Sequence, residues 1–176
     1  MKNIIFLFAL LFICSTSTIK AQQTINKEAS KIDFHITGGG IFKVKGTFTG
    51  MQGDFNLDTS TLENANFDIC VDAATINTKN KKRDTHLRTS DFFDVEKHPN
   101  ICFQSTAVTK SSDGYITTGS LTIHGVTKEV EIPFTFSENT FTGHLVINRF
   151  DYEIGKTFGT MRVGTEATVT ITCVVN

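Results

Sequence analysis

The sequence predicts an all-β protein in which about eight antiparallel strands close into a barrel. Apolar residues recur at every second position through most of the 176 residues, with Thr, Lys, Asp, Asn and Glu between them, so each strand has one dry face and one wet face. Turn signals such as Gly38-Gly39-Gly40 and Asp113-Gly114 separate these runs. No long amphipathic helix is available to cover the sheet, which favours closure of the sheet on itself. A two-sheet sandwich is the alternative.

The apolar face of this sheet is built from short alternating runs along the chain. They span residues 32–36, 42–48, 55–57, 67–71, 101–103, 119–123, 130–136, 141–147 and 169–175. An eight-stranded barrel is just wide enough to be filled by its own side chains or to hold one slender ligand. The chain has 16 Phe and no Trp, and both interpretations stay open: a packed core, or a tunnel for an apolar chain. In a tunnel, the lining residues would be Phe34, Ile36, Phe42, Val44, Phe48, Phe67, Ile69, Phe93, Phe103, Leu121, Ile123, Phe134, Phe136, Leu145 and Ile147.

A charged stretch, residues 78–99, interrupts the β pattern. It is compatible with a helix over residues 79–90, capped by Thr78, and predicts a short helical crossover segment near residues 79–93 at the rim of the barrel. The candidate residues for the mouth of the barrel, where they could hold an anionic head group, are Arg83, Asp84, His86 and Arg88. Two alternatives remain: these side chains anchor the loop by hydrogen bonds, or Asp84 and His86 form an acid/base pair.

Several function classes lack support in the sequence. The chain has neither a G-x-S-x-G nor an H-E-x-x-H motif, so we expect a protein that is not an enzyme. The five histidines show no ligand spacing, and His35, His124 and His144 fall at polar positions of the strand pattern, so we expect no metal and no cofactor. The net charge of −1 argues against nucleic acid as a partner.

The N-terminus reads as a secretory signal peptide over residues 1–21, which leaves a single domain over residues 22–176 in the periplasm or outside the cell. Its apolar run, residues 4–13, is about half the roughly 20 residues of a spanning helix, so no integral membrane span is expected. Acylation of Cys14 in a lipoprotein is the alternative. Strand parity places Cys70 and Cys102 away from the apolar face, where a disulfide between neighbouring strands is one option, and turns Cys173 inward.

Several motifs together carry a family resemblance. They are RDTHLRTSDFFD at 83–94, KHPNICFQS at 97–105, GSLTIHGVTK at 119–128, VKGTF at 44–48, INRFDY at 147–152 and VGTE at 163–166. Over roughly Thr24 to Val175 the chain resembles the YceI-like family of secreted polyisoprenoid-binding proteins. The resemblance implies an extended, lipocalin-like antiparallel barrel whose pore holds the isoprenoid tail of an amphiphile such as a quinone or a polyprenyl phosphate.

A carrier of this kind would make transient contact with a membrane, and its oligomeric state stays open, a dimer included. The alternative function is a secreted stress-response or interaction protein with a filled barrel core and no lipid ligand.

Overall fold

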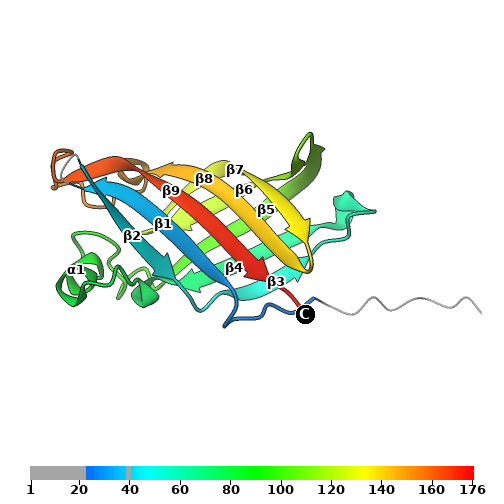
Figure 1. Ribbon diagram of the computed structural model, residues 1–176, viewed down its shortest axis with the longest axis horizontal. Helices are drawn as coiled ribbons and strands as arrows, with labels where there is room; N and C mark the ends of the chain where they lie inside the picture. The colour runs from blue at the N-terminus through cyan, green and yellow to red at the C-terminus, as the bar shows by residue number, and fades with distance from the viewer. Residues whose placement is uncertain (1–22, 39–40) are drawn as a thin grey trace, which may run out of the picture.

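The computed structural model describes residues 23–38 and 41–176 as one curled, nine-stranded antiparallel sheet (Figure 1). The predicted signal peptide and Cys14 lie outside the described residues. The strands are β1 (Lys31–Gly38), β2 (Phe42–Phe48), β3 (Gln52–Asn56), β4 (Asn66–Asp72), β5 (Asn100–Ser111), β6 (Gly114–Ile123), β7 (Val126–Ser137), β8 (Thr140–Asn148) and β9 (Val163–Val174). They are hydrogen-bonded in the order β2-β1-β9-β8-β7-β6-β5-β4-β3.

The all-β, antiparallel prediction is confirmed, with two differences in detail. The sheet has nine strands rather than about eight, one for each of the nine apolar runs, and the short run at 55–57 belongs to an edge strand of its own, β3, that pairs with β4. The curl is that of an open half-barrel, since the strand order of the described residues ends at β2 on one side and β3 on the other. One continuous sheet also decides against the sandwich.

The edge of β2 is covered by the chain that follows β4. Thr47 and Asn77 exchange two backbone hydrogen bonds of 3.0 Å, just after the 3-10 helix η2 (Ala73–Thr75). The helix α1 (Lys81–Leu87) follows at once and lies at the same end of the barrel as the last residues of β1 and the first residues of β2 (Figure 1). This end also carries the loop that begins with the 3-10 helix η3 (Arg149–Tyr152), whereas the C-terminus lies toward the opposite end (Figure 1). A further 3-10 helix, η1 (Leu62–Asn64), precedes β4. We call the end with α1 the mouth.

The predicted helical crossover is present, but its helix is shorter than the sequence suggests. Asn80, not Thr78, caps α1: its Oδ1 accepts a hydrogen bond of 3.1 Å from the backbone N–H of Arg83. Lys79 has a φ of 60°, and Asn80 after it is extended, so neither residue belongs to the helix. The helix ends at Leu87, and a series of turns carries the chain to β5.

Aromatic side chains close the end of the barrel opposite the mouth. The ring centroids of Phe134 and Phe141 are 4.4 Å apart, and those of Phe55 and Phe67 are 4.8 Å apart. Phe136 of β7 stacks on Phe55 of β3 across the interior of the curled sheet, with ring centroids 5.9 Å apart. All but Phe136 are buried, so this cluster forms a plug of packed core.

The disulfide that the sequence offered as one option is present, and Cys173 is buried as predicted. Cys70 and Cys102 face each other in the β4–β5 ladder and form a disulfide. Cys173 is a free, buried thiol. Burial raises the pKa of Cys173 to about 11, against which a hydrogen bond to Ser30 acts weakly.

Candidate functional site: an apolar cavity with a cationic mouth

An apolar cavity of about 600 Å³ occupies the barrel between the aromatic plug and the mouth. Ligand pockets are typically of this size and mostly apolar. Most residues predicted to line a tunnel do line this cavity: Phe34, Ile36, Val44, Phe48, Phe67, Ile69, Phe93, Phe103, Leu121, Ile123, Leu145 and Ile147. They come from six strands and the segment after α1, because alternate residues of each strand face the inside of the curled sheet.

Three of the residues predicted to line the tunnel do not. Phe134 and Phe136 belong to the aromatic plug, where rings from neighbouring strands and from across the sheet fill the interior. Phe42 shares the parity of Val44 and Phe48 but is 72% exposed, since it starts an edge strand at the rim of the barrel with no opposite wall to cover it. Alternation predicts the face of a side chain, but not where along the barrel axis the interior is open.

Close packing of the wall depends on a glycine. The ring of Phe34 lies over Gly46 on the neighbouring strand, so a Cβ at position 46 would be 2.4 Å from Cζ of Phe34. Such a contact is far inside van der Waals distance. Gly46 thus lets the β1–β2 wall keep this ring in the cavity.

The predicted mouth residues divide into two groups. Arg83 and His86 line the cavity, whereas Asp84 and Arg88 anchor the backbone around it. Arg83 donates hydrogen bonds from Nε to Thr78 Oγ1 (2.7 Å) and from Nη2 to the Thr78 carbonyl (2.9 Å). Arg88 donates to the carbonyl oxygens of Ala74 and Ile76, both at 2.7 Å. The anchoring interpretation therefore holds for Arg88 and in part for Arg83.

Asp84 is a buried carboxylate with local partners. It accepts hydrogen bonds from the backbone N–H of Thr78 (2.9 Å) and from the Thr78 hydroxyl. Burial by itself would raise the pKa of Asp84, but these hydrogen bonds and the charges of Arg88 and Arg83 outweigh it and hold the pKa below its usual value. The Nε2 of His86 contacts Asp91 instead, at 3.0 Å. Asp84 and His86 are thus engaged with different partners, which removes the geometric basis for an acid/base pair.

Arg149 is a central residue of the mouth that the sequence reasoning did not single out. Its side chain is 4% exposed and donates to the carbonyl oxygens of Gly164, Ile154, Gly155, Phe158 and Val163, at 2.5–3.2 Å. These bonds use all five N–H donors of the guanidinium and gather the loop from η3 to β9 around one point. Burial lowers the pKa of Arg149. The sequence did contain an indication of this role, because Arg149 continues the inward parity of Leu145 and Ile147. A charged side chain is unexpected at an inward position.

The charges that line the cavity all have one sign. Its charged residues are Arg83, Arg149 and Arg162, and His86 lies among them at the mouth. A cation in a partly buried, low-dielectric setting attracts an anion more strongly than it would in water. The interior thus combines an apolar body with a positive entrance.

Comparison with known proteins places this architecture in a family. A model of the YceI-like domain matches residues 23–175, nearly the whole described chain. The chain belongs to the YceI-like family. Protein YceI of Salmonella agona is 34% identical over 134 residues, covering 74% of this chain and 70% of the relative. The UPF0312 protein ECA1782 of Pectobacterium atrosepticum is 33% identical over 134 residues, with the same coverage of 74% and 70%.

Solved structures share the YceI-like fold. The crystal structure of Burkholderia cenocepacia BcnA superposes with a TM-score of 0.77 at 24% identity, covering 86% of this chain and 99% of that one. A Campylobacter jejuni YCEI protein gives 0.67 at 25% identity, covering 77% and 86%. A polyisoprenoid binding domain from Saccharophagus degradans gives 0.65 at 16% identity, covering 89% and 99%. Within the part of the chain that the structure describes, no helix has the length and hydrophobicity to cross a membrane.

Proposed function

We propose that this YceI-like protein binds an amphiphilic isoprenoid lipid, with the tail in the apolar cavity and the head group at the mouth, and carries it in the periplasm or outside the cell. The observation that carries the proposal is the cavity of about 600 Å³, apolar along its length and lined at its charged positions by arginines alone. A structural neighbour described as a polyisoprenoid binding domain supports the choice of ligand.

The alternative, an interaction protein whose barrel is filled by its own side chains, fits this interior less well. A filled barrel would be packed to the density of a protein core, with few voids larger than a water molecule. Here packing of that kind is reached at the aromatic plug, and the space toward the mouth is left open.

The charge of the mouth favours a head group with anionic or strongly accepting oxygens. Arg83 donates hydrogen bonds to Thr78 from Nε and from Nη2, so the two hydrogens on its Nη1 stay available for a ligand. Arg149 has no free donor but contributes its charge. Among isoprenoid amphiphiles, a polyprenyl phosphate therefore fits the mouth better than a neutral quinone, whose carbonyl oxygens would gain less from the charge.

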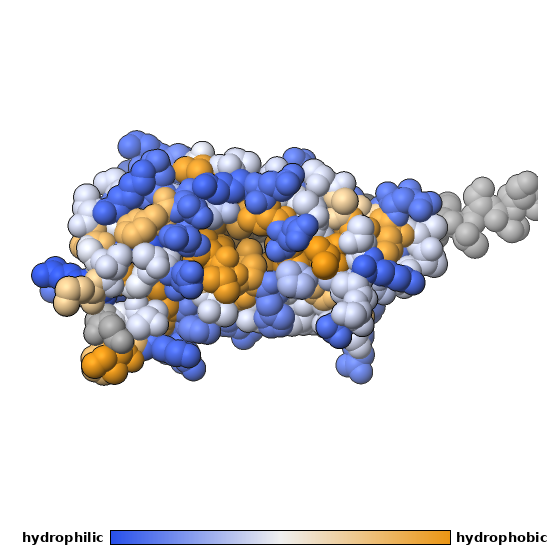
Figure 2. Space-filling model, turned by 90° about the horizontal axis from the view of Figure 1, so that it is seen from above, coloured by the Kyte–Doolittle hydropathy of each residue, from blue (hydrophilic) through white to orange (hydrophobic). Residues whose placement is uncertain are grey.

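The rim beside the mouth offers a means of approach to a membrane. Ile41 and Met161 are 83% and 87% exposed, and Phe42 adjoins Ile41. Gly38 lies close to both exposed segments, because a Cβ at this position would be 3.6 Å from the carbonyl oxygen of Phe42 and 3.7 Å from the carbonyl oxygen of Arg162. Figure 2 shows apolar residues at a protruding corner of the molecule as well as in a band along the exposed face. Apolar side chains at such a rim would dip into a lipid surface while the ligand is exchanged.

The test is to extract purified protein with organic solvent and identify bound lipids by mass spectrometry. We expect an isoprenoid amphiphile at near-stoichiometric amounts. Ala167 lines the cavity, so the Ala167→Trp substitution should fill part of the space for the lipid tail. Thr168→Trp is the control, because it adds an indole ring at the next position of β9, which is exposed. Ala167→Trp should lose the lipid and Thr168→Trp should retain it, with circular dichroism confirming that both are folded. Wild-type protein that is free of lipid and binds no added polyprenyl phosphate would overturn the proposal.

A further inference from the structure

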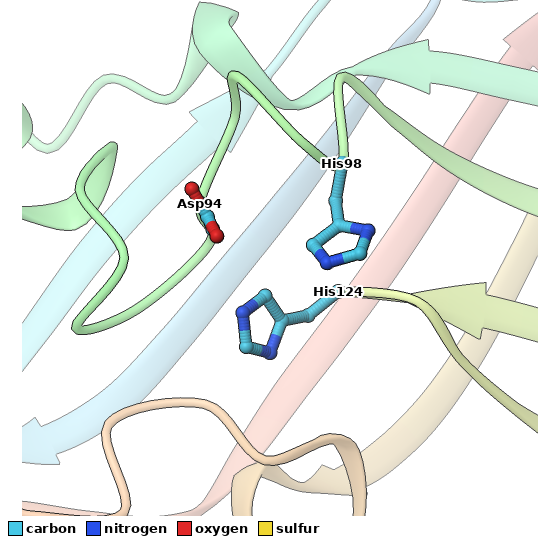
Figure 3. A group of neighbouring side chains, drawn as sticks. All are labelled: Asp94, His98 and His124. Carbon is cyan, nitrogen blue, oxygen red and sulfur yellow. The ribbon is translucent and has the colours of Figure 1, made fainter.

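Three side chains with metal-ligating groups meet outside the cavity, on the outer side of the mouth. Asp94 and His98 belong to the turns after α1, and His124 belongs to the β6–β7 turn. One ligand atom from each lies within 4.8 Å of the other two. The two imidazole rings meet edge to face, with centroids 5.0 Å apart (Figure 3). The sequence pattern led us to expect no metal, because the histidines show no ligand spacing along the chain, and His124 joins Asp94 and His98 only in the fold.

The backbone holds two of these three residues in a conformation that residues other than glycine adopt infrequently. Asp94 and His124 have φ values of 44° and 51°, in the left-handed region. The N–H of Asp94 donates to the Thr89 carbonyl at 2.9 Å, and the N–H of His98 donates to the Asp94 carbonyl at 2.8 Å. Observed departures of this kind concentrate at functional sites, where the surrounding structure enforces them.

Gly125 allows the two histidines to approach each other. A Cβ at this position would lie 2.6 Å from Cε1 of His98 and 3.0 Å from its Nδ1, and the φ of 75° is itself unfavourable for a side chain. The His98 ring therefore lies directly on the backbone of the β6–β7 turn. Any larger residue at 125 would push the ring away from His124.

The orientation of His124 is that of a metal ligand. Its Nδ1 lies 3.2 Å from the backbone carbonyl of Tyr152. Because a carbonyl oxygen can only accept, Nδ1 carries the proton and Nε2 presents its lone pair. Figure 3 shows one ring nitrogen of His124 on the side of Asp94 and the other directed away from it. Metal-ligating histidines almost always use their second nitrogen in this way, to donate to a carbonyl or carboxylate that fixes the ring.

Lys97 occupies part of this site and must give way. Its Nζ lies 3.2 Å from Oδ2 of Asp94, and its side chain is 74% exposed. An exposed ion pair of this kind contributes only about 0–1 kcal/mol, so a divalent cation that binds at the same carboxylate can displace it.

We propose that Asp94, His98 and His124 bind a divalent transition-metal ion of the Zn²⁺ class. Two imidazole nitrogens and one carboxylate oxygen suit Zn²⁺, and three protein ligands leave a fourth position for water. Ligand bonds of about 2.0–2.2 Å place donor atoms roughly 3.4 Å apart in a tetrahedral site, so side-chain rotation by ~1 Å completes the geometry. The ion joins the turns after α1 to the β6–β7 turn and, through His124, to Tyr152 of η3. Ile123 and Ile154, which line the cavity, lie beside these joined segments.

The experiment is isothermal titration of tag-free, chelator-treated protein with Zn²⁺, in a buffer that does not bind metals. We expect one site per chain and a rise in melting temperature on addition of Zn²⁺. His98→Ala, His124→Ala and the nearly isosteric Asp94→Asn should each weaken binding at least 10-fold. His144→Ala, an exposed histidine of β8, should leave binding unchanged.

Co²⁺ gives a second readout that does not depend on heat. Its visible d–d absorption should show a four- or five-coordinate site in wild-type protein and in His144→Ala, and should be lost in Asp94→Asn. If the alanine variants fail to fold, Asp94→Asn alone decides. The proposal is overturned if wild-type protein binds no Zn²⁺ at micromolar concentration, or if Asp94→Asn binds Zn²⁺ and Co²⁺ as wild type does.

Discussion

Replacement of Arg149 by Met should loosen the mouth of the cavity more than any other single change to a charged residue there. Met keeps an apolar side chain of similar length but has no N–H donor. Two of the carbonyl acceptors, Ile154 and Gly155, make their hydrogen bonds in buried surroundings, and the other three are part-buried. A buried acceptor that loses its donor costs about 1–3 kcal/mol, which gives roughly 2–6 kcal/mol for these two.

The lost charge offsets part of that cost. A buried guanidinium is itself unfavourable to desolvate, so its removal returns some free energy, and we expect a net loss of roughly 2–4 kcal/mol. Arg149→Lys has three N–H donors for five acceptors and should fall between Met and wild type. The matched control is Arg162→Met, an exposed arginine of the same loop, which should stay within about 0.5 kcal/mol of wild type.

Urea unfolding measures the global part of this effect, and amide hydrogen exchange measures the local part. The amides to follow are those of Ile154, Phe158 and Val163, all within the loop that Arg149 gathers. The loss appears as a lower unfolding midpoint, as faster exchange in this loop, or as both. An Arg149→Met protein with the midpoint and the loop exchange of wild type would refute the role assigned to Arg149.

Three further predictions follow from other parts of the structure. Reduction of Cys70–Cys102, at a sequence separation of 32, should lower the free energy of unfolding by about 3.7 kcal/mol on the chain-entropy estimate, measured by urea unfolding with and without a phosphine reductant; an unchanged midpoint would contradict it. Burial raises the pKa of Cys173 to about 11, so the unfolded chain releases this proton at lower pH than the folded protein does, and the free energy of unfolding should fall as pH rises from about 9 to 11. Cys173→Ala should show a shallower fall over this range. If wild type and Cys173→Ala lose stability with equal slopes, Cys173 is not the group responsible. Changing Ile41 and Met161 together to Asn should slow lipid transfer from phosphatidylglycerol vesicles while leaving the amount of lipid bound at equilibrium unchanged, and a transfer rate equal to wild type would exclude the rim as the contact.

Much of the fold could be predicted from alternation, because an antiparallel strand with one buried face must repeat every two residues. The pairing of Cys70 with Cys102 was within reach for the same reason, since both share one parity on strands that turned out to be neighbours. Alternation gives Phe42 and Phe134 the same inward parity as the cavity residues, but it does not show that Phe42 lies exposed at the rim and Phe134 in the plug. Position along the barrel axis depends on strand stagger and on where the sheet is open, and neither is encoded by a period of two.

The polar parts of the mouth were harder to predict, because their partners are backbone atoms brought together only by the fold. Arg88 and Asp84 were candidates for ligand contact, yet they bind carbonyls and amides of residues 74–78. A sequence shows that a charge is present but not whether its hydrogen-bonding capacity is already used.

The same reasoning separates the two arginines that do reach the cavity. All five donors of Arg149 are used by the protein, so replacing it would alter ligand binding through loop structure and local charge together. Arg83 keeps donors on Nη1, so Arg83→Gln removes the charge and those donors while a side-chain amide can still donate to Thr78. If a phosphate is bound, Arg83→Gln should weaken binding of a polyprenyl phosphate far more than of the matching polyprenol. Equal weakening of both would mean that Arg83 only shapes the mouth, and that the apolar wall alone selects the ligand.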